Sequence, residues 1–284
     1  MNGFHHKWGR CCAMVALLLT AGCTENPFDS GSEISAKTSV SGRVILLNSS
    51  SSEGVYVWLE GLSLGVFTGP NGDFQLRLPS PSSQPGGGFT GSANLYFYMA
   101  NFQLDSTRLV LRSGEFLYSQ GELNEKGELL RPRTLPKLLN LSTALRPSAI
   151  PVSYDSTLET IVTLQVLAPQ VELLAYGAGS NFLTLAAIQK INTAQAWVSS
   201  LYSGFLQIDT TFFSGTYVFT TSYLLDPYFL TPGDYLVIPY IWVKQDHIPR
   251  GLIHSLGAAY EKFDLNYVNI PFQREGGRLT VTAD

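Results

Sequence analysis

Residues 66–78 read VFTGPNGDFQLRL, and this stretch decides the fold class. Apolar and polar residues alternate on both sides of Asn71-Gly72, which is the strongest short signal for a β-hairpin because both residues tolerate positive φ. We therefore expect that a β-branched residue in place of Gly72 prevents folding. Similar short apolar runs recur between Gly, Pro, Ser and Thr, in a chain with 12% aromatic and only 14% charged residues. Such a sequence is predicted to be all-β, with two antiparallel β-sandwich domains.

Two strands are expected before this stretch, at residues 41–46 (SGRVIL) and 55–59 (VYVWL), with a Ser-rich loop between them. The order G-R-V, G-V-x-V-x-L and T-x-x-N-G-x-F-x-L resembles the carboxypeptidase regulatory-like domain, a small transthyretin-like β-sandwich of bacterial secreted and surface proteins. The matching residues are Gly42, Arg43, Val44, Gly54, Val55, Val57, Leu59, Thr68, Asn71, Gly72, Phe74 and Leu76. The resemblance implies an accessory β-sandwich over residues 40–113 and no peptidase activity.

The chain departs from this family after residue 78. The family usually continues with P-x-G-x-Y and a closing Gly-Tyr, whereas residues 79–92 form a longer loop here and residues 95–102 (LYFYMANF) take the place of the next strand. Residues 109–111 are expected to close the sheet. Residues 114–136 are predicted to be a connector with a hairpin around residues 124–127. Pro132 and Pro136 near its end disfavour a helix there.

Residues 137–284 are predicted to form the second sandwich. The expected strands are residues 160–167, 171–176, 183–191, 205–208, 215–221, 235–243, 267–272 and 278–282. A helix over residues 183–197 is the alternative to the third of these strands, because Leu185, Ile188 and Ile191 recur every three residues. Thr184 and Asn192 are poor helix formers, which favours the strand.

The sharpest structural motif of the second sandwich lies at residues 230–235, Leu-Thr-Pro-Gly-Asp-Tyr, and alternating apolar residues follow it. It resembles the tyrosine corner of Greek-key sandwiches such as fibronectin type III domains, in which a tyrosine hydroxyl bonds to the backbone upstream. The resemblance gives Tyr235 this role, packed over Leu230, and implies an immunoglobulin-like sandwich. Pro239, inside the expected strand, predicts a bulge or an edge position.

The N-terminus carries a predicted targeting signal. Lys7 and Arg10 precede an uncharged apolar run at residues 11–20 (CCAMVALLLT), which is too short to span a bilayer and is typical of a secretory signal peptide. A buried core helix is the alternative. The ending Ala21-Gly22-Cys23 resembles the lipobox of bacterial lipoproteins, although Thr20 departs from the usual leucine. The resemblance implies cleavage between Gly22 and Cys23 and acyl chains on Cys23 that anchor the protein to a membrane.

Residues 1–22 are therefore the predicted signal peptide, and residues 23–39 are the lipidated cysteine and a flexible polar tether. An edge strand centred on Ile34 is the alternative for the tether. Thr24, at the second position of the processed chain, is not aspartate, which in the enterobacterial sorting pattern favours the outer membrane. Processing removes Cys11 and Cys12, so Cys23 remains as the single cysteine and no disulfide can form within one chain.

Processing also removes Lys7 and Arg10 but no acidic residue, which changes the net charge from −4 to −6. The chain has no basic stripe, so nucleic acid is not an expected partner. The expected partners are a membrane, through the lipid anchor, and a protein or glycan that the sequence does not identify. We place the protein outside the cytoplasm.

No catalytic or cofactor motif stands out in the processed chain. His247 and His254 are its only histidines, and they lack the spacing of a metal site or metalloprotease. There is no G-x-S-x-G elbow for a nucleophilic serine, and Gly177-Ala178-Gly179 lacks the third glycine of a dinucleotide site. The aspartates that could bind calcium do not follow the required spacing and are expected in turns; they are Asp226, Asp234, Asp246 and Asp264. We expect neither a metal nor a cofactor besides the covalent lipid.

Aromatic residues are the remaining candidates for binding. They stack on sugars or anchor protein interfaces, unless they belong to the core; the cluster comprises Trp197, Tyr202, Phe212, Phe213, Tyr223, Tyr228 and Phe229. The leading hypothesis is a non-catalytic, membrane-anchored lipoprotein that acts as a binding, spacer or assembly module. A glycan-binding surface lipoprotein that uses these aromatic loops is the alternative. A third hypothesis, an unrecognised hydrolase, requires His247 or His254 in a pocket against an acid.

Overall fold

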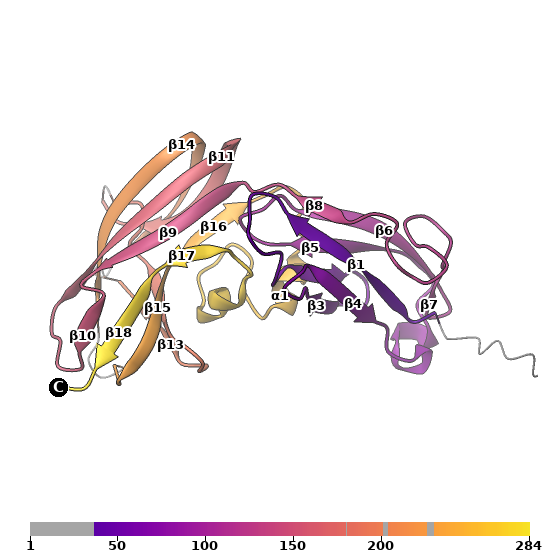
Figure 1. The fold of residues 1–284 in the computed structure, drawn as a ribbon, viewed down its shortest axis with the longest axis horizontal. Coiled ribbons are helices and arrows are strands. Elements are labelled where there is room, and N and C mark those ends of the chain that lie inside the picture. The colour runs from indigo at the N-terminus through magenta and orange to yellow at the C-terminus, as the bar shows by residue number, and fades with distance from the viewer. Residues whose placement is uncertain (1–36, 180, 201–203, 226–229) are drawn as a thin grey trace, which may run out of the picture. The chain divides into compact units, whose positions relative to one another are not determined.

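The computed structural model describes residues 37–179, 181–200, 204–225 and 230–284, and Lys37–Asp284 forms one compact unit. The predicted signal peptide and Cys23 lie outside the described residues. As predicted, the fold is all-β, with four sheets in the described part (Figure 1). The helices there are α1 (Arg250–Ser255) and the 3-10 helices η1 (Pro81–Ser83), η2 (Pro85–Gly87) and η3 (Leu265–Asn269). None of these described helices has the length and apolar character needed to cross a membrane.

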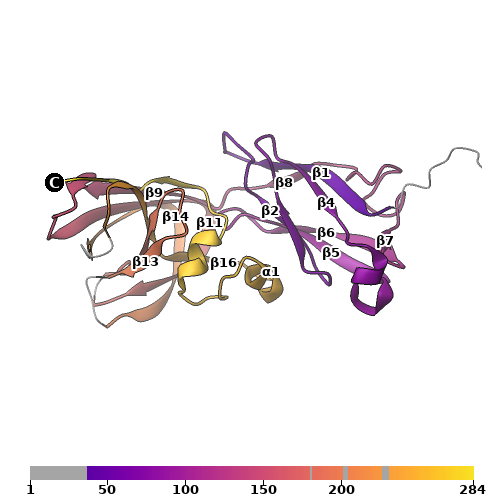
Figure 2. The same ribbon diagram turned by 90° about the horizontal axis from the view of Figure 1, so that it is seen from below.

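Two sheets form the first module, which comprises β1 to β8 (Figure 2). The three-stranded sheet has the order β4-β1-β8, with β1 (Ser39–Leu46), β4 (Asp73–Arg77) and β8 (Arg133–Leu135). The five-stranded sheet has the order β3-β2-β5-β6-β7, with β2 (Tyr56–Leu59), β3 (Leu64–Phe67), β5 (Gly91–Tyr98), β6 (Asp105–Arg112) and β7 (Glu115–Phe116). Apolar side chains of both sheets share one core, in which the rings of Phe74 and Phe97 meet edge-on at 5.8 Å.

The turn at Asn71-Gly72 joins two sheets instead of two paired strands. The Gly72 amide donates to the Gly69 carbonyl at 2.8 Å, which closes the turn. However, β3 pairs with β2 whereas β4 pairs with β1, so the predicted hairpin is wrong and the chain crosses the core here. Gly72 has a φ of +82°, and a Cβ atom on it would lie 2.0 Å from the Val44 carbonyl oxygen. The Val44 amide donates to the Gly72 carbonyl at 2.9 Å, so the turn is fastened to β1.

Residues 114–136, the expected connector, contribute to both sheets of the first module. Within this range, β7 pairs with β6 and β8 pairs in parallel with β1. Leu123 and Leu135 are buried in the core of the module. The turn expected around residues 124–127 is present, since the Gly127 amide donates to the Asn124 carbonyl at 3.2 Å. Strand pairing within the module therefore continues as far as Leu135.

Two further sheets form the second module, which comprises β9 to β18. One has the order β14-β11-β9-β17, with β16 also paired to β11; its strands are β9 (Leu139–Arg146), β11 (Thr157–Gly177), β14 (Leu206–Leu224), β16 (Ile241–Lys244) and β17 (Arg274–Gly276). The other has the order β10-β18-β15-β12-β13, with β10 (Ala149–Pro151), β12 (Ala186–Lys190), β13 (Ala196–Ser199), β15 (Gly233–Pro239) and β18 (Arg278–Thr282). Both sheets bury apolar side chains.

Several expected strands of this module differ in extent. The strands expected at 160–167 and 171–176 are one strand, β11, interrupted by a register shift between Val166 and Gln170. Residues 205–208 and 215–221 likewise fall mostly within the single strand β14. Residues 183–191 contain the strand β12, which confirms the strand over the helical alternative. The strand expected at 267–272 is wrong, because residues up to Asn269 belong to η3.

Pro239 marks a change of sheet within the expected strand 235–243. β15 ends at Pro239 in the sheet that contains β12, and β16 begins at Ile241 paired with β11 in the opposite sheet. Proline has no amide hydrogen to donate to a neighbouring strand, and β15 ends with it. Tyr240, between the two strands, is completely buried. The alternating apolar pattern thus continues across two strands that lie in different layers.

Candidate functional site

The two modules meet through a buried aromatic and aliphatic cluster. Trp58 and Tyr98, on the face of the first module's five-stranded sheet that points away from its own core, belong to this cluster. The second module contributes residues of β16, α1 and the segment after it, which include Trp242, Leu252, Ile253 and Tyr267. The Trp58 ring packs over Gly251, where an added Cβ atom would lie 3.2 Å from it. A side chain at this point of α1 would require the indole to shift by a few tenths of an ångström.

Two side-chain amides form hydrogen bonds across the junction between the modules. Asn101 is fully buried, and its Nδ2 donates to the carbonyls of Leu139 and Gln273 at 3.1 Å each, while its Oδ1 accepts from the Gln273 amide at 3.0 Å. In the other direction, Gln245 Nε2 donates to the Phe102 carbonyl at 2.9 Å, and its Oε1 accepts from the Leu104 amide at 2.7 Å. These bonds join backbone groups of the two modules through side chains and so fix their contact.

A groove of about 1010 Å³ lies beside this junction and is lined by both modules. The first module contributes Tyr96 and residues 103–106, and the second contributes residues around Gln170, Gln245 and Tyr260. The Tyr96 ring packs against Trp58 with centroids 5.8 Å apart, and the Tyr260 ring packs edge-on against Trp242 at 5.5 Å. The buried indoles of the junction therefore support the two tyrosines that line the groove.

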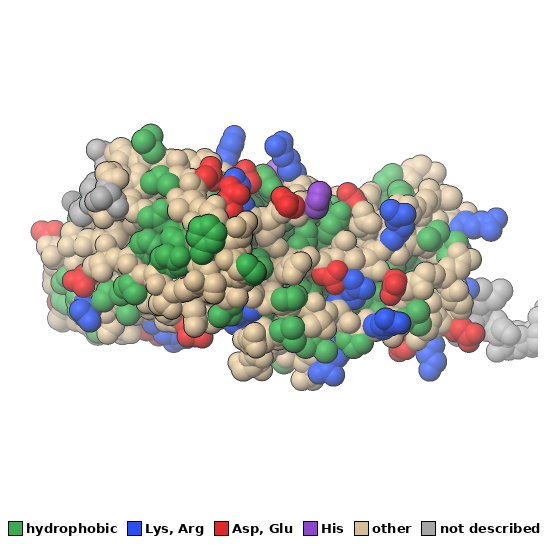
Figure 3. Space-filling model, turned by 90° about the horizontal axis from the view of Figure 1, so that it is seen from above, with side chains coloured by type: hydrophobic (Ala, Val, Ile, Leu, Met, Phe, Trp, Pro, Cys, Tyr) green, Lys and Arg blue, Asp and Glu red, His purple; other side chains and the backbone are tan. Residues whose placement is uncertain are grey.

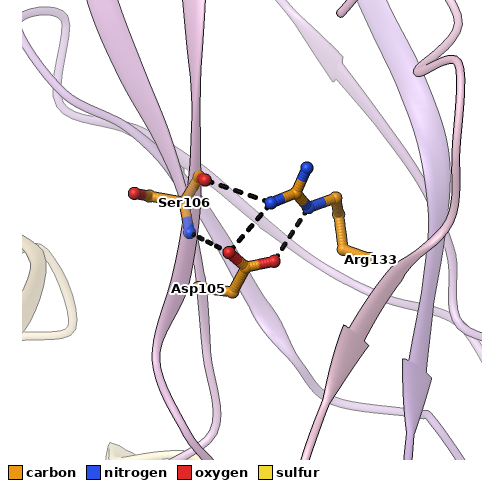
Figure 4. Close-up of polar contacts among 3 residues, drawn as sticks. All are labelled: Asp105, Ser106 and Arg133. Atoms are coloured by element: carbon orange, nitrogen blue, oxygen red, sulfur yellow. Dashed lines mark hydrogen bonds and ion pairs between the residues drawn. The ribbon is translucent and has the colours of Figure 1, made fainter.

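Charged residues of the groove are largely held in ion pairs. Asp105 accepts two bonds from Arg133, at 2.8 and 2.9 Å, and the guanidinium also donates to the Ser106 carbonyl at 3.2 Å (Figure 4). The bond to Asp105 raises the pKa of Arg133. Because Arg133 lies on β8 and Asp105 on β6, this pair also connects the two sheets of the first module.

Lys244 forms the second charged cluster of the groove, with Glu172 at 2.6 Å and Asp209 at 3.4 Å. The hydrogen bond to Glu172 raises the pKa of Lys244. Burial raises the pKa of Tyr96 and of Tyr260, and the nearby charges of Glu60 and Glu261 add to these shifts. Both phenols therefore keep their protons and can donate hydrogen bonds at neutral pH. In Figure 3, acidic and basic side chains gather beside a histidine on this face of the molecule.

His247 and His254 lie apart from any metal-binding cluster in the described part of the chain. His247 is exposed at the rim of the groove beside Asp246, with a φ of +66°, and His254 is exposed on α1. Among the described residues, no group of three or more histidine, cysteine or acidic side chains could hold a metal ion. Asp264 caps η3 by accepting from the Asn266 amide at 2.7 Å, and Asp234 accepts from Thr280 at 2.9 Å.

Tyr235 makes the contacts that a tyrosine corner requires. Its hydroxyl donates to the Thr231 carbonyl at 2.7 Å and accepts from the Thr231 amide at 3.0 Å. Tyr235 and Leu230 are both buried in one core cluster, and the Trp197 ring packs edge-on against Tyr235 at 5.6 Å. These residues stabilise the second module and do not line the groove.

The aromatic cluster proposed from the sequence does not form one surface. Phe212 and Tyr223 are buried in different core clusters, whereas Phe213 is exposed. Tyr202, Tyr228 and Phe229 lie outside the described residues, as do Gly22 and Cys23. Sequence reasoning missed Tyr96 and Tyr260, which line the groove. They come from different modules, so no local spacing signals their proximity.

The comparisons with known proteins provide little further information. No protein family matches the sequence, and no curated protein matches it. Among solved structures, the Bacillus anthracis TIE protein aligns with a TM-score of 0.24 and 8% sequence identity, over 74% of this chain and 48% of that chain. This chain thus spans about half the length of that protein. An alignment at this TM-score carries no argument about fold or function.

Proposed function

We propose that this protein is a membrane-anchored, extracytoplasmic lipoprotein, with the outer membrane as the favoured site, and that its two β-sandwich modules form a non-catalytic binding, spacer or assembly unit. The anchor is supported by the sequence Ala21-Gly22-Cys23 directly after the apolar run at residues 11–20. We assign the first module to the carboxypeptidase regulatory-like type and the second to the immunoglobulin-like type. The bonds of Tyr235 to Thr231 support the second assignment.

The observation that carries the spacer role is the buried junction between the modules. A spacer must hold its ends in a fixed relation, and a flexible linker would allow the modules to move independently. Here the apolar cluster around Trp58 and the reciprocal bonds of Asn101 and Gln245 oppose such motion. The two modules therefore act as one rigid element.

Membrane fractionation with mass spectrometry of the N-terminal peptide tests the anchor. We expect the wild type in the membrane fraction, with a lipidated peptide that starts at Cys23, and release or arrested processing for Cys23→Ala. Cys12→Ala is the matched control, since it removes a cysteine of the apolar run and leaves Cys23 in place. An unmodified N-terminal peptide from the soluble fraction would overturn the lipoprotein assignment.

A glycan-binding role is the second candidate, and the groove at the module junction favours it. Tyr96 and Tyr260 line the groove, and the amides of Gln103, Gln170 and Gln245 lie among its other residues. Aromatic rings next to hydrogen-bonding amides are suited to the faces and hydroxyls of sugars. These residues differ from the aromatic cluster that the sequence suggested.

Direct binding of the wild type to a glycan array tests this second role. We expect Tyr96→Ala and Tyr260→Ala to weaken binding to any glycan that the wild type retains. Phe67→Ala removes an aromatic ring that is 53% exposed and does not line this groove, and should leave binding unchanged. Binding that Phe67→Ala weakens as much as the tyrosine variants do would locate the glycan elsewhere.

A further inference from the structure

One edge strand of the second module is long, and no described strand pairs with its outer side. β14 pairs with β11 along its whole length, and among the described residues no strand pairs with its other edge. It has 19 residues, of which only Asp209 is charged. Natural proteins usually protect such edges with lysines, prolines or covering segments, because unpaired backbone groups recruit other strands. β14 contains no lysine and no proline.

The half of β14 after its register shift is Gly215–Leu224. It contains no charged residue, and it consists mainly of Thr, Tyr, Val and Phe, which favour strands. Val218 is 61% exposed and Leu224 is 52% exposed on its outer face. β11 and β14 lie at the top of Figure 1, and Figure 3 shows the molecule from that side. Hydrophobic side chains gather over this part of the second module.

The carbonyls at the two ends of this segment already have partners. The Phe213 carbonyl accepts from the Tyr217 hydroxyl at 3.1 Å, and the Leu224 carbonyl accepts from the Ser199 hydroxyl at 2.5 Å. Ser199 lies on β13, the edge strand of the opposite sheet, so this bond joins the two edges. Between Phe213 and Leu224, no other described strand pairs with this edge of β14.

We propose that this segment of β14 pairs antiparallel with the same segment of a second copy of the chain, which forms a dimer with one sheet continuous across a two-fold axis. An axis through Thr220 places Val218 opposite Ser222 and Thr216 opposite Leu224 on the outer face. On the inner face Tyr223 is fully buried in its own core, so the new cross-strand contacts are those of the outer face.

The absence of charge in this segment is what favours a second copy as the partner. A charged residue near the axis would face its own equivalent, and like charges directly opposite destabilise a strand pair. An uncharged strand meets no such penalty with itself. Once this edge is paired with its copy, it has no free side for a third chain. Assembly through it therefore stops at a closed dimer and does not continue into a fibre.

Disulfide crosslinking of the full chain in detergent tests the proposal. Residues opposite each other in an antiparallel pair have Cα atoms about 4.5–5.5 Å apart, within the range for a disulfide. Under mild oxidation we expect Thr220→Cys to form a covalent dimer beyond the background of wild type. Ala144→Cys is the matched control. Ala144 is exposed and pairs with Ile161, which pairs with Thr220, so it lies in the same row of the sheet but away from the edge.

A charge placed on the edge provides the second test. Thr220→Lys sets two ammonium groups against each other at the axis, and we expect it to raise the dimer dissociation constant at least about tenfold, because like-charge contacts oppose association. Ala144→Lys adds the same charge two strands away and should leave the dimer intact. Light scattering of the detergent-solubilised chain reports the mass. A monomeric wild type, or crosslinking of Thr220→Cys no stronger than that of Ala144→Cys, would overturn the proposal, as would a dimer that Thr220→Lys leaves intact.

Discussion

Asn101 and Gln245 cross the module junction in opposite directions, and each side-chain amide bonds to backbone groups of the other module. Asn101 reaches Leu139 and Gln273, whereas Gln245 reaches residues 102 and 104. The contact between the modules therefore depends on these two amides as well as on the apolar cluster around Trp58.

Replacing Asn101 tests this dependence. Asn101→Ala removes three hydrogen bonds and leaves the buried Leu139 carbonyl and the part-buried backbone groups of Gln273 without these partners, so we expect a loss of about 3 kcal/mol in the free energy of unfolding. Denaturant titration measures this change. Asn140→Ala is the control, because it removes only an exposed side-chain bond to Gln165 and should cost under about 0.5 kcal/mol. Equal effects of the two substitutions would contradict the role of Asn101.

Trp58→Ala should uncouple the modules. Its ring belongs to the junction cluster, and removal of a buried tryptophan typically costs about 3–5 kcal/mol. We expect calorimetry to show a single transition for the wild type and two separated transitions for the variant. Trp197→Ala removes an indole that packs within the second module, and it should lower the midpoint without splitting the transition. Two transitions in the wild type would show that the junction does not couple the modules.

Gly72 is expected to tolerate no side chain, for two separable reasons. Its positive φ disfavours other residues, and a Cβ atom would collide with the Val44 carbonyl. We expect Gly72→Ala to destabilise the fold by more than about 2 kcal/mol. Gly86 has a similar φ of +70° but nothing within 4 Å of the added Cβ, so Gly86→Ala measures the effect of φ alone. The difference in unfolding free energy between the two variants gives the cost of the collision.

Two buried tyrosines should respond in opposite ways to loss of the hydroxyl. The Tyr223 hydroxyl is buried without a hydrogen-bond partner among the described residues, so Tyr223→Phe should leave stability unchanged or raise it by up to about 1 kcal/mol. The Tyr267 hydroxyl donates to the Ile241 carbonyl at 2.6 Å and accepts from Arg274 at 3.0 Å. Tyr267→Phe should therefore cost about 2 kcal/mol. Thermal unfolding of both variants against wild type measures these changes, and destabilisation by Tyr223→Phe would indicate a partner for that hydroxyl.

The protein should lose stability above about pH 10, the pKa of an exposed tyrosine. Burial raises the pKa of Tyr98, Tyr223 and Tyr240 in the folded state. The folded state thus favours the neutral phenols. Their contribution to the free energy of unfolding is complete below the tyrosine pKa of the unfolded chain and is lost as the pH rises above that pKa. Denaturation midpoints measured with phenolate absorbance should fall over this range. Ionisation of all tyrosines near pH 10 with the fold intact would contradict the prediction.

The sequence predicted local structure well but not which sheet each strand joins. The turn at Asn71-Gly72 forms because its backbone preferences are local. The pairing of β4 with β1 is not local, because it depends on the shared core that contains Phe74 and Phe97. The apolar pattern through Pro239 did not reveal the change of sheet either. The residues on either side of Tyr240, at the end of β15 and the start of β16, are all buried, so the pattern looks like one strand.

The candidate site was less predictable than the fold. Tyr96 and Tyr260 are far apart in sequence and meet at one groove only because the modules pack together. The junction itself was not expected, since Trp58 and Tyr98 occupy alternating strand positions that usually face solvent in a sandwich with one core. Such apolar residues on the outer face of β2 and β5 are the one signal that could have indicated a second packed surface.

The parallel pairing of β1 with β8 has a mechanical consequence. Val44 to Leu46 of β1 lie beside Arg133 to Leu135 of β8, and the chain leaves β8 towards the second module. A pull on Lys37 against the second module therefore draws the start of one strand and the end of its parallel neighbour in opposite directions. Their hydrogen bonds bear this load together, in shear, and do not break one after another as in an unzipping hairpin. The parallel pairing of β1 with β8 therefore makes the first module resistant to unfolding by a pull along the chain.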